Sequence, residues 1–162
     1  MSKILQATLF AGAIVVGGCK PSTVAVDSRD PAITAIIDSL VKVSMDGAAK
    51  VDAGKVLEPA AGTGEVTFLA GNVMVTGIEP IRAAFRKTYE GLQSQNQTLL
   101  DKRIRVLSPD VAIATFVAEG TYTDKAGWTS EPVDIGMTIV FVKEDGQWRI
   151  RHAHQSIVQG SP

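Results

Sequence analysis

His152 and His154 are the only histidines of this 162-residue chain, and Ser156 follows them at the same spacing. Because side chains alternate along a strand, all three residues share one face. An imidazole titrates near neutral pH and can serve as a general acid or base, or as a polar contact for a ligand. Two histidines supply only two metal ligands, and spacing does not fix a third, for which Glu119 is the nearest candidate. We therefore expect no metal and no cofactor.

The Asp145–Gly146 pair predicts the strand register that orients these residues. Asp-Gly is favoured in two-residue hairpin turns, so Glu144 should pair with Gln147. Trp148 and Ile150 share the face of the histidines, which marks that face as the buried one. The predicted pairs along the hairpin are Phe141 with Ile150, Ile139 with His152, Met137 with His154, and Ile135 with Ser156. The outer face receives Asp134, Thr138, Val140, Arg149 and Arg151.

The inner surface of this hairpin changes from apolar to polar along its length, as in a pocket with an apolar floor and a few polar groups. The candidate ligand-binding residues are His152, His154, Ser156, Met137 and Ile139, together with either Glu119 or Tyr122. Glu119 and Tyr122 lie on opposite faces of one strand, and the loop at 124–130 leaves open which of them points inward. The catalytic residues are unknown, with His152 and His154 as candidates. The outer face is either a homodimer surface or a solvated sheet face.

Helices come first along the chain and strands last. Asp30 and Pro31 mark the start of an amphipathic helix that runs to about residue 51. Shorter helices are predicted at about 53–57 and from 78 to about 92. Strands are predicted at 64–69, 97–107, 110–123, 131–144 and 147–158, with a turn or short extended piece at 71–77. A bent, antiparallel sheet with helices over one face is the economical α+β arrangement of these elements.

Two segments add a family resemblance to this pattern. The ending Gly146–Ser156 spaces Gly, Trp, Ile, His, His and Ser in one series, and Val75–Ile81 leads through a glycine into a helix. With the element order over residues 30–158, they resemble the nuclear transport factor 2-like (NTF2-like) superfamily, more narrowly its SnoaL-like and calmodulin-kinase-association-like branches. The resemblance implies a cone-shaped α+β barrel, in which three N-terminal helices cover the concave face of a strongly bent antiparallel sheet. It also implies frequent dimers through the sheet, and a pocket that serves isomerases, cyclases, dehydratases or plain binding proteins.

The resemblance disfavours one of these activities. The general base of the superfamily's ketosteroid isomerases is an aspartate whose place falls near Phe68 here, beside Thr67 and Leu69. None of the three is acidic, and proton transfer beside a carbonyl needs a base within hydrogen-bond reach. We favour a binding domain for a small, mainly apolar molecule or a protein partner. The alternative is a SnoaL-like enzyme that uses His152 or His154 as its acid or base.

The N-terminal end resembles a bacterial lipoprotein signal. Lys3 precedes an almost unbroken apolar run at 7–16, and Val16-Gly17-Gly18-Cys19 resembles a lipobox, whose cysteine is acylated. The predicted segments are a signal peptide at 1–18, a lipidated tether at 19–29, and one domain at 30–160. The alternative is an ordinary secretory signal with a chance cysteine. Lys20, in place of an aspartate, favours the outer membrane facing the periplasm.

The charges of the chain exclude one class of partner. It has 16 basic and 17 acidic side chains, and the basic ones are scattered rather than clustered. This balance is atypical of a nucleic-acid-binding surface. We expect contact with the membrane to be made through acyl chains on Cys19.

Overall fold

The first helix of the domain begins where the sequence predicts. The computed structural model describes residues 30–62 and 64–159, so the predicted signal peptide, the tether and Cys19 lie outside the described residues. Helix α1 spans Pro31–Ala49. The Asp30 carboxylate accepts hydrogen bonds from the backbone N–H groups of Ala32, at 2.9 Å, and Ile33, at 3.0 Å. Proline suits the first helical position because the N–H that it lacks would have no partner within the helix.

The remaining elements follow in the predicted order. Helix α2 spans Ala53–Val56, the 3-10 turn η1 spans Glu58–Ala60, and helix α3 spans Ile78–Tyr89. The strands are β1 Thr67–Ala70, β2 Val73–Thr76, β3 Leu92–Ser108, β4 Val111–Asp124, β5 Val133–Glu144 and β6 Gln147–Gln159. β3 begins at Leu92, whereas the sequence predicts its start near residue 97. The prediction is late because the first residues of β3 are mostly polar and lack the apolar alternation that marks a strand. No helix in this part of the chain combines the length and apolar character that a membrane crossing requires.

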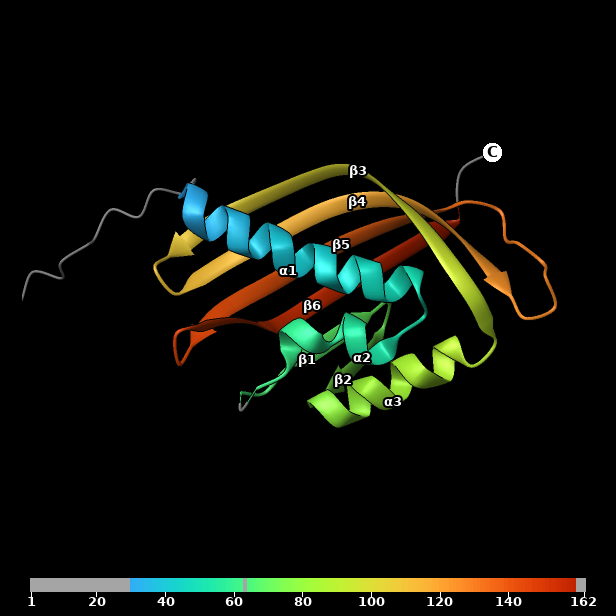
Figure 1. Cartoon of the computed structure of the whole chain (residues 1–162), viewed down its shortest axis with the longest axis horizontal. Helices are drawn as coiled ribbons and strands as arrows, with labels where there is room; N and C mark the ends of the chain where they lie inside the picture. The colour runs from blue at the N-terminus through green and yellow to red at the C-terminus, as the bar shows by residue number, and fades with distance from the viewer. Residues whose placement is uncertain (1–29, 63, 160–162) are drawn as a thin grey trace, which may run out of the picture.

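The strands form one bent sheet in the order β2-β1-β6-β5-β4-β3. β1 pairs in parallel with β6, and all other neighbours are antiparallel. The pairing of β3 with β4 is irregular after Leu92, Leu99 and Val106. Such irregularities bend a strand and increase its twist, and the sheet curves around the helices (Figure 1). The α+β architecture predicted from the sequence is confirmed.

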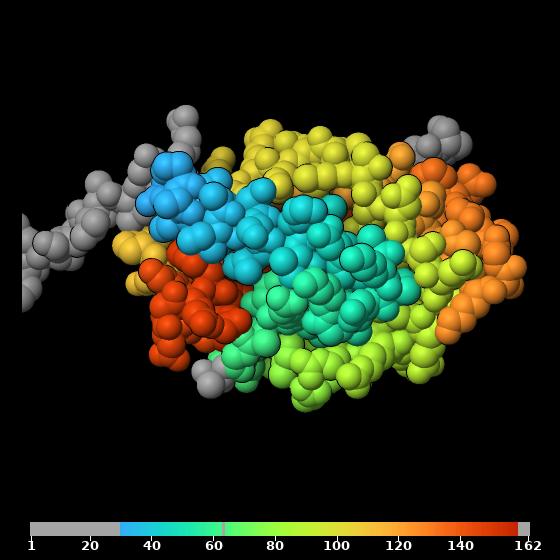
Figure 2. Space-filling model, in the orientation of Figure 1, coloured from blue at the N-terminus to red at the C-terminus, as the bar shows by residue number. Residues whose placement is uncertain are grey.

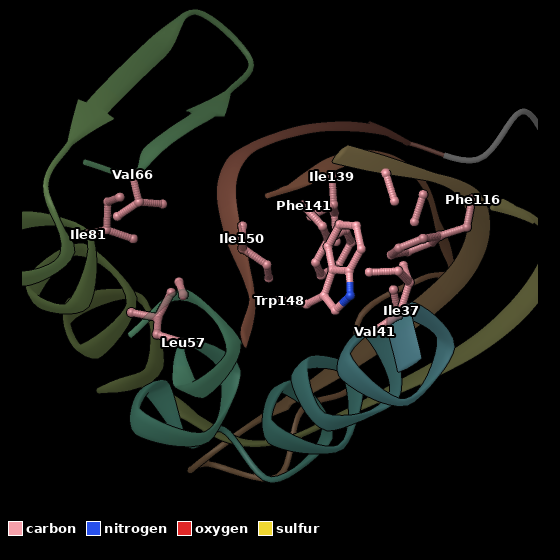
Figure 3. Close-up of a cluster of buried hydrophobic side chains, with 13 residues drawn as sticks. Ile37, Val41, Leu57, Val66, Ile81, Phe116, Ile139, Phe141, Trp148 and Ile150 are labelled. Atoms are coloured by element: carbon pink, nitrogen blue, oxygen red, sulfur yellow. The ribbon is translucent and has the colours of Figure 1, made fainter. Parts of the chain in front are cut away.

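The helices lie together on one face of the sheet (Figure 1), and their side chains form a continuous cover in the space-filling view (Figure 2). Figure 3 shows the buried cluster beneath α1, to which the sheet contributes Phe141 and Trp148. Ile37 and Val41 of α1 meet them from the other side. Trp148 and Ile150 are each 6% exposed, so the prediction that they face the interior is confirmed.

The turn between β5 and β6 has the predicted form. Asp145 and Gly146 have φ angles of 49° and 77°, which are the left-handed values that a type I′ turn requires at both central positions. Glu144 pairs with Gln147 on either side of the turn. The hairpin register therefore starts as the sequence predicts.

A β-bulge then changes the phase of β6. Phe141 lies opposite Ile150, as predicted, but the next pair joins Val140 to His152. Arg151 is thus an extra residue with no partner on β5. An extra residue of this kind moves every later side chain to the other face of the sheet, because alternation has a period of two.

The predicted pairs beyond the bulge are therefore wrong. The observed pairs are Ile139 with Ala153, Thr138 with His154, Met137 with Gln155, and Gly136 with Ser156. His152, His154 and Ser156 share the outer face of the sheet with Thr138 and Val140. Ala153 and Gln155 take their place on the inner face.

The side chain of Arg151 ties the bulge to its surroundings. Its guanidinium forms an ion pair with Glu144 and donates a hydrogen bond to the carbonyl of Ala60 at 3.3 Å. The hydrogen bond from Arg151 holds the pKa of the Glu144 carboxyl below its ordinary value. Gly64 packs so closely that a Cβ there would overlap the guanidinium. Contacts from three separate segments thus converge on the one residue that the ladder leaves unpaired.

We predict that Trp148→Ala lowers the free energy of unfolding by about 3–5 kcal/mol, because it removes a large side chain from a packed core. Trp128 is the matched control, since its side chain is 57% exposed. Trp128→Ala should cost about 1 kcal/mol or less. Urea denaturation of both variants measures the difference, and a loss below about 1 kcal/mol for Trp148→Ala would contradict its place in the core.

Candidate functional site

A cavity of about 390 Å³ lies between the helices and the inner face of the sheet. Each α-helix and each strand of the described residues contributes to its wall. Its volume falls within the range of small-molecule sites. None of the lining residues found in the described part of the chain is Asp, Glu, Lys, Arg or His. The cavity is therefore lined by side chains that are uncharged at neutral pH.

Aliphatic side chains make up much of this wall. Val41 and Met45 are four residues apart on α1, so they lie on the same side of the helix and both line the cavity. Met137 and Ile139 line it from β5. Both of these β5 residues were predicted from the sequence to lie at the ligand site; that they bind a ligand stays a prediction.

Aromatic side chains form a second part of the wall, along α3. Phe85 and Tyr89 are also four residues apart, and their ring centroids are 5.8 Å apart with the rings nearly perpendicular. Phe68 of β1 packs against Phe85 with a centroid distance of 5.2 Å. Both distances are within the range of favourable aromatic pairs, which stiffens this side of the cavity.

The polar groups of the cavity are amides and hydroxyls. Gln95 and Gln97 point inward from β3, and Gln155 points inward from β6. The amide nitrogen of Gln97 lies 3.5 Å from the side-chain oxygen of Gln95. The hydroxyls of Ser44 and Thr88 donate to backbone carbonyls at 2.9 and 3.1 Å, so these two donors are already engaged. The three glutamines supply most of the hydrogen-bonding capacity toward a ligand.

Tyr89 is the one residue of the lining, among those described, with a resolved change in pKa. Burial raises the pKa of its phenol to about 12, and the negative charge of Asp52 acts in the same direction. The residue is 8% exposed. Its phenol is therefore neutral at physiological pH.

His152, His154 and Ser156 do not line this cavity. The bulge at Arg151 sends all three to the outer face, where His154 and Ser156 are exposed and His152 is partly buried. On the neighbouring strand β1, His152 pairs with Thr67 and His154 with Leu69. The predicted pocket position of these side chains is wrong, because it assumed unbroken alternation along β6.

Glu119 and Tyr122 also lie away from the cavity lining. Glu119 is exposed on the outer face, directly opposite Asp134 of β5. Tyr122 has the inward parity of β4, but it lies near the strand end, where its ring packs edge-on against Trp128 at 5.8 Å. Asp134 is on the outer face, as predicted. Within residues 30–62 and 64–159, no group of three His, Cys, Asp or Glu side chains is placed to hold a metal.

Sequence reasoning missed the glutamines and the tyrosine of the cavity. Gln95 lies before the strand predicted at 97–107 and Gln97 begins it, so the sequence predicts no shared face for them. Tyr89 falls within the helix predicted from 78 to about 92, for which no cavity-facing residue is predicted. A sharper signal was available, since Phe85 and Tyr89 continue the stripe of Ile81 across a helix that must face the sheet.

Comparison with known proteins identifies the family. Residues 33–159 match the model of the calcium/calmodulin dependent protein kinase II association domain. The chain belongs to this family. Among curated proteins, none matches the sequence.

Solved structures share the fold at low sequence identity. A candidate association domain of this kind from Xanthomonas campestris is 24% identical, with a TM-score of 0.62 over 80% of this chain and 88% of that one. The association domain of the C. elegans kinase is 18% identical, with a TM-score of 0.63 over 80% of this chain and 99% of that one. An NTF2-like protein from Salmonella enterica is 18% identical, with a TM-score of 0.70 over 81% and 94%. The domain therefore has the NTF2-like fold, as the sequence resemblance implied.

We predict that Tyr89 makes stability fall as the pH rises from 10 to about 12. In that window the unfolded chain loses the phenolic proton while the folded chain keeps it, so rising pH favours unfolding; below pH 10 the contribution is complete. Tyr89→Phe should flatten this part of the curve of unfolding free energy against pH. Tyr122→Phe, at the only other tyrosine of the chain, is the control and should flatten the curve less than Tyr89→Phe does, because the Tyr122 side chain is 37% exposed. A flatter curve for Tyr122→Phe than for Tyr89→Phe would contradict the burial of the Tyr89 phenol.

Proposed function

We propose that this association-domain family member binds a small, mainly apolar molecule in the cavity between α1, α3 and the sheet. The observation that carries the proposal is the cavity of about 390 Å³, whose wall is apolar apart from a few amides and hydroxyls. The replacement of water by an apolar ligand in a cavity of this kind lowers the free energy, because apolar surface is removed from water. Val73 and Ile157 line the cavity and are 58% and 59% exposed, so they mark an opening toward solvent.

Binding is favoured over the alternative of a SnoaL-like enzyme by the chemistry of the wall. Acid–base catalysis needs a titratable group within hydrogen-bond reach of the substrate. His152 and His154, the candidates for that role, lie on the outer face. Phe68, at the place where a ketosteroid isomerase would carry its base, contributes a phenyl ring to the wall. The Tyr89 phenol has a pKa of about 12 and stays protonated at neutral pH, so it is a poor substitute for a general base.

We predict that naphthalene binds to the purified full-length protein, followed by the change in its fluorescence, and that Ala84→Trp weakens this binding at least about tenfold. Ala84 lines the cavity from α3, so an indole there fills space that the ligand needs. Ala83 is its neighbour on the same helix and is exposed, as Ala84 is, but Ala83 is absent from the cavity wall. Ala83→Trp is therefore the matched control and should bind as the wild type does. Equal binding by both variants would place the ligand elsewhere, and no binding by the wild type would reject the proposal.

We also propose that the domain is held at a membrane by acyl chains on Cys19, at the outer membrane facing the periplasm. The support is the lipobox-like sequence alone, since Cys19 lies outside the described residues. The segment 20–29 would let the domain move at most about 35 Å from the bilayer, because an extended chain spans about 3.5 Å per residue. A ligand taken from or delivered to that surface would then be within reach.

Metabolic labelling with a radioactive fatty acid in a bacterial host tests the anchor. The wild-type chain should be labelled, and it should fractionate with the outer membrane. Cys19→Ser should lose the label, because the thiol is the acylated atom, and Cys19 is the only cysteine of the chain. Labelling that persists in Cys19→Ser would refute the site, and an unlabelled wild type would favour an ordinary secretory signal.

A further inference from the structure

We propose that the cavity selects uncharged ligands, and that Gln95 and Gln97 recognise a neutral polar group, such as a hydroxyl, on an otherwise apolar molecule. This inference rests on the proposed binding function and names the class of ligand. The cavity volume of about 390 Å³ falls in the range of sites that hold small molecules. It can accommodate a ligand of the size of a two-ring aromatic alcohol.

Among the described residues, no charged side chain lines the wall of the cavity. An ion that enters an apolar space loses its hydration, and only a partner charge or several hydrogen bonds can offset that loss. The residues that line the cavity in the described ranges contain no such partner charge. An inner-face cation does exist on β3, where Lys102 lies opposite Phe116 of β4. Its ammonium is paired with Asp38 of α1, so its charge is directed to the helix.

The side-chain amides of Gln95 and Gln97 provide hydrogen-bond donors and acceptors for a ligand. Gln95 and Gln97 are two residues apart on β3, and both line the cavity. At 3.5 Å, the contact between the Gln97 nitrogen and the Gln95 oxygen is at the limit of a hydrogen bond, so it holds the pair only weakly. A carboxamide offers both donors and an acceptor. A hydroxyl can therefore donate to one amide and accept from the other, whereas a carboxylate or an ammonium uses only half of this capacity.

The bulge on β6 places a glutamine, rather than a histidine, on the inner face of the sheet. With unbroken alternation, His154 and Ser156 would face inward, and an imidazole would bring a group that becomes cationic as the pH falls. The extra residue Arg151 brings Gln155 inward in their place. Carboxamides thus face the cavity from both β3 and β6, and these two strands are separated in the sheet by β4 and β5.

Four ligands that share one ring system test the inference by isothermal titration calorimetry with the full-length protein. They are naphthalene, 1-naphthol, 1-naphthoate and 1-naphthylmethylammonium. At neutral pH, 1-naphthol should bind about fivefold more tightly than naphthalene, the effect of one net hydrogen bond. The anion and the cation should each bind at least about tenfold more weakly than 1-naphthol.

Two variants assign the effect to the amides. Gln95→Leu/Gln97→Leu should remove the advantage of 1-naphthol over naphthalene, measured as the ratio of the two affinities for the same variant. Asn96 lies between the two glutamines on the outer face and is exposed, so Asn96→Leu is the matched control and should bind all four ligands as the wild type does.

The outcomes separate the two proposals. Binding of the charged ligands within about threefold of 1-naphthol would overturn the selectivity and leave the cavity as a binding site. An advantage of 1-naphthol that survives in the double variant would overturn the role of the glutamines. Failure of all four ligands to bind the wild type would reject the binding function itself.

Discussion

The unpaired residue Arg151 determines what this domain can do with its cavity. Strand β6 passes from the buried core at Trp148 and Ile150 to the cavity wall at Gln155 and Ile157, and its phase changes between the two. The ion pair with Glu144, the hydrogen bond to Ala60 and the close packing of Gly64 all act on this one side chain. Because Glu144 belongs to β5, and Ala60 and Gly64 precede β1, the bulge is tied to the packing of the segment before β1 as well as to its own hairpin. Neighbouring residues could not regain simple alternation without breaking them.

The cavity exists because the sheet and the helices fit closely in one region and separate in another. Phe141 and Trp148 fill the space beneath the first half of α1, where they meet Ile37 and Val41. Farther along α1, Met45 faces the cavity instead. The aromatic pairs along α3 build the opposite wall, and the irregularities of the β3–β4 pairing bend the sheet. A neutral, apolar cavity follows from the same packing that builds the core, since the walls continue its aliphatic and aromatic side chains.

The sequence was sufficient for most of the fold and for part of the cavity. The cap at Asp30, the apolar stripe of α1 and the Asp145–Gly146 turn are local signals, and each was located correctly. Met137 and Ile139 were placed inward because β5 alternates without interruption on its side of the turn. The histidines were misplaced because a bulge arises from long-range contacts of Arg151, which no local pattern records. The glutamines of β3 could not be predicted for a related reason. Polar side chains at the start of a strand point inward only where a cavity, rather than a packed core, lies behind the strand, and the cavity depends on long-range packing.

The exchange of histidine for glutamine on the inner face also separates two properties of the domain. His152 and His154 stay on the sheet, but on the outer face beside Thr67, Leu69 and Thr138. Both imidazoles thus lie away from the cavity, on a face that the sequence predicts to be either a homodimer surface or a solvated sheet face. A ligand held by amides and apolar contacts depends on shape and hydrogen bonding rather than on pH.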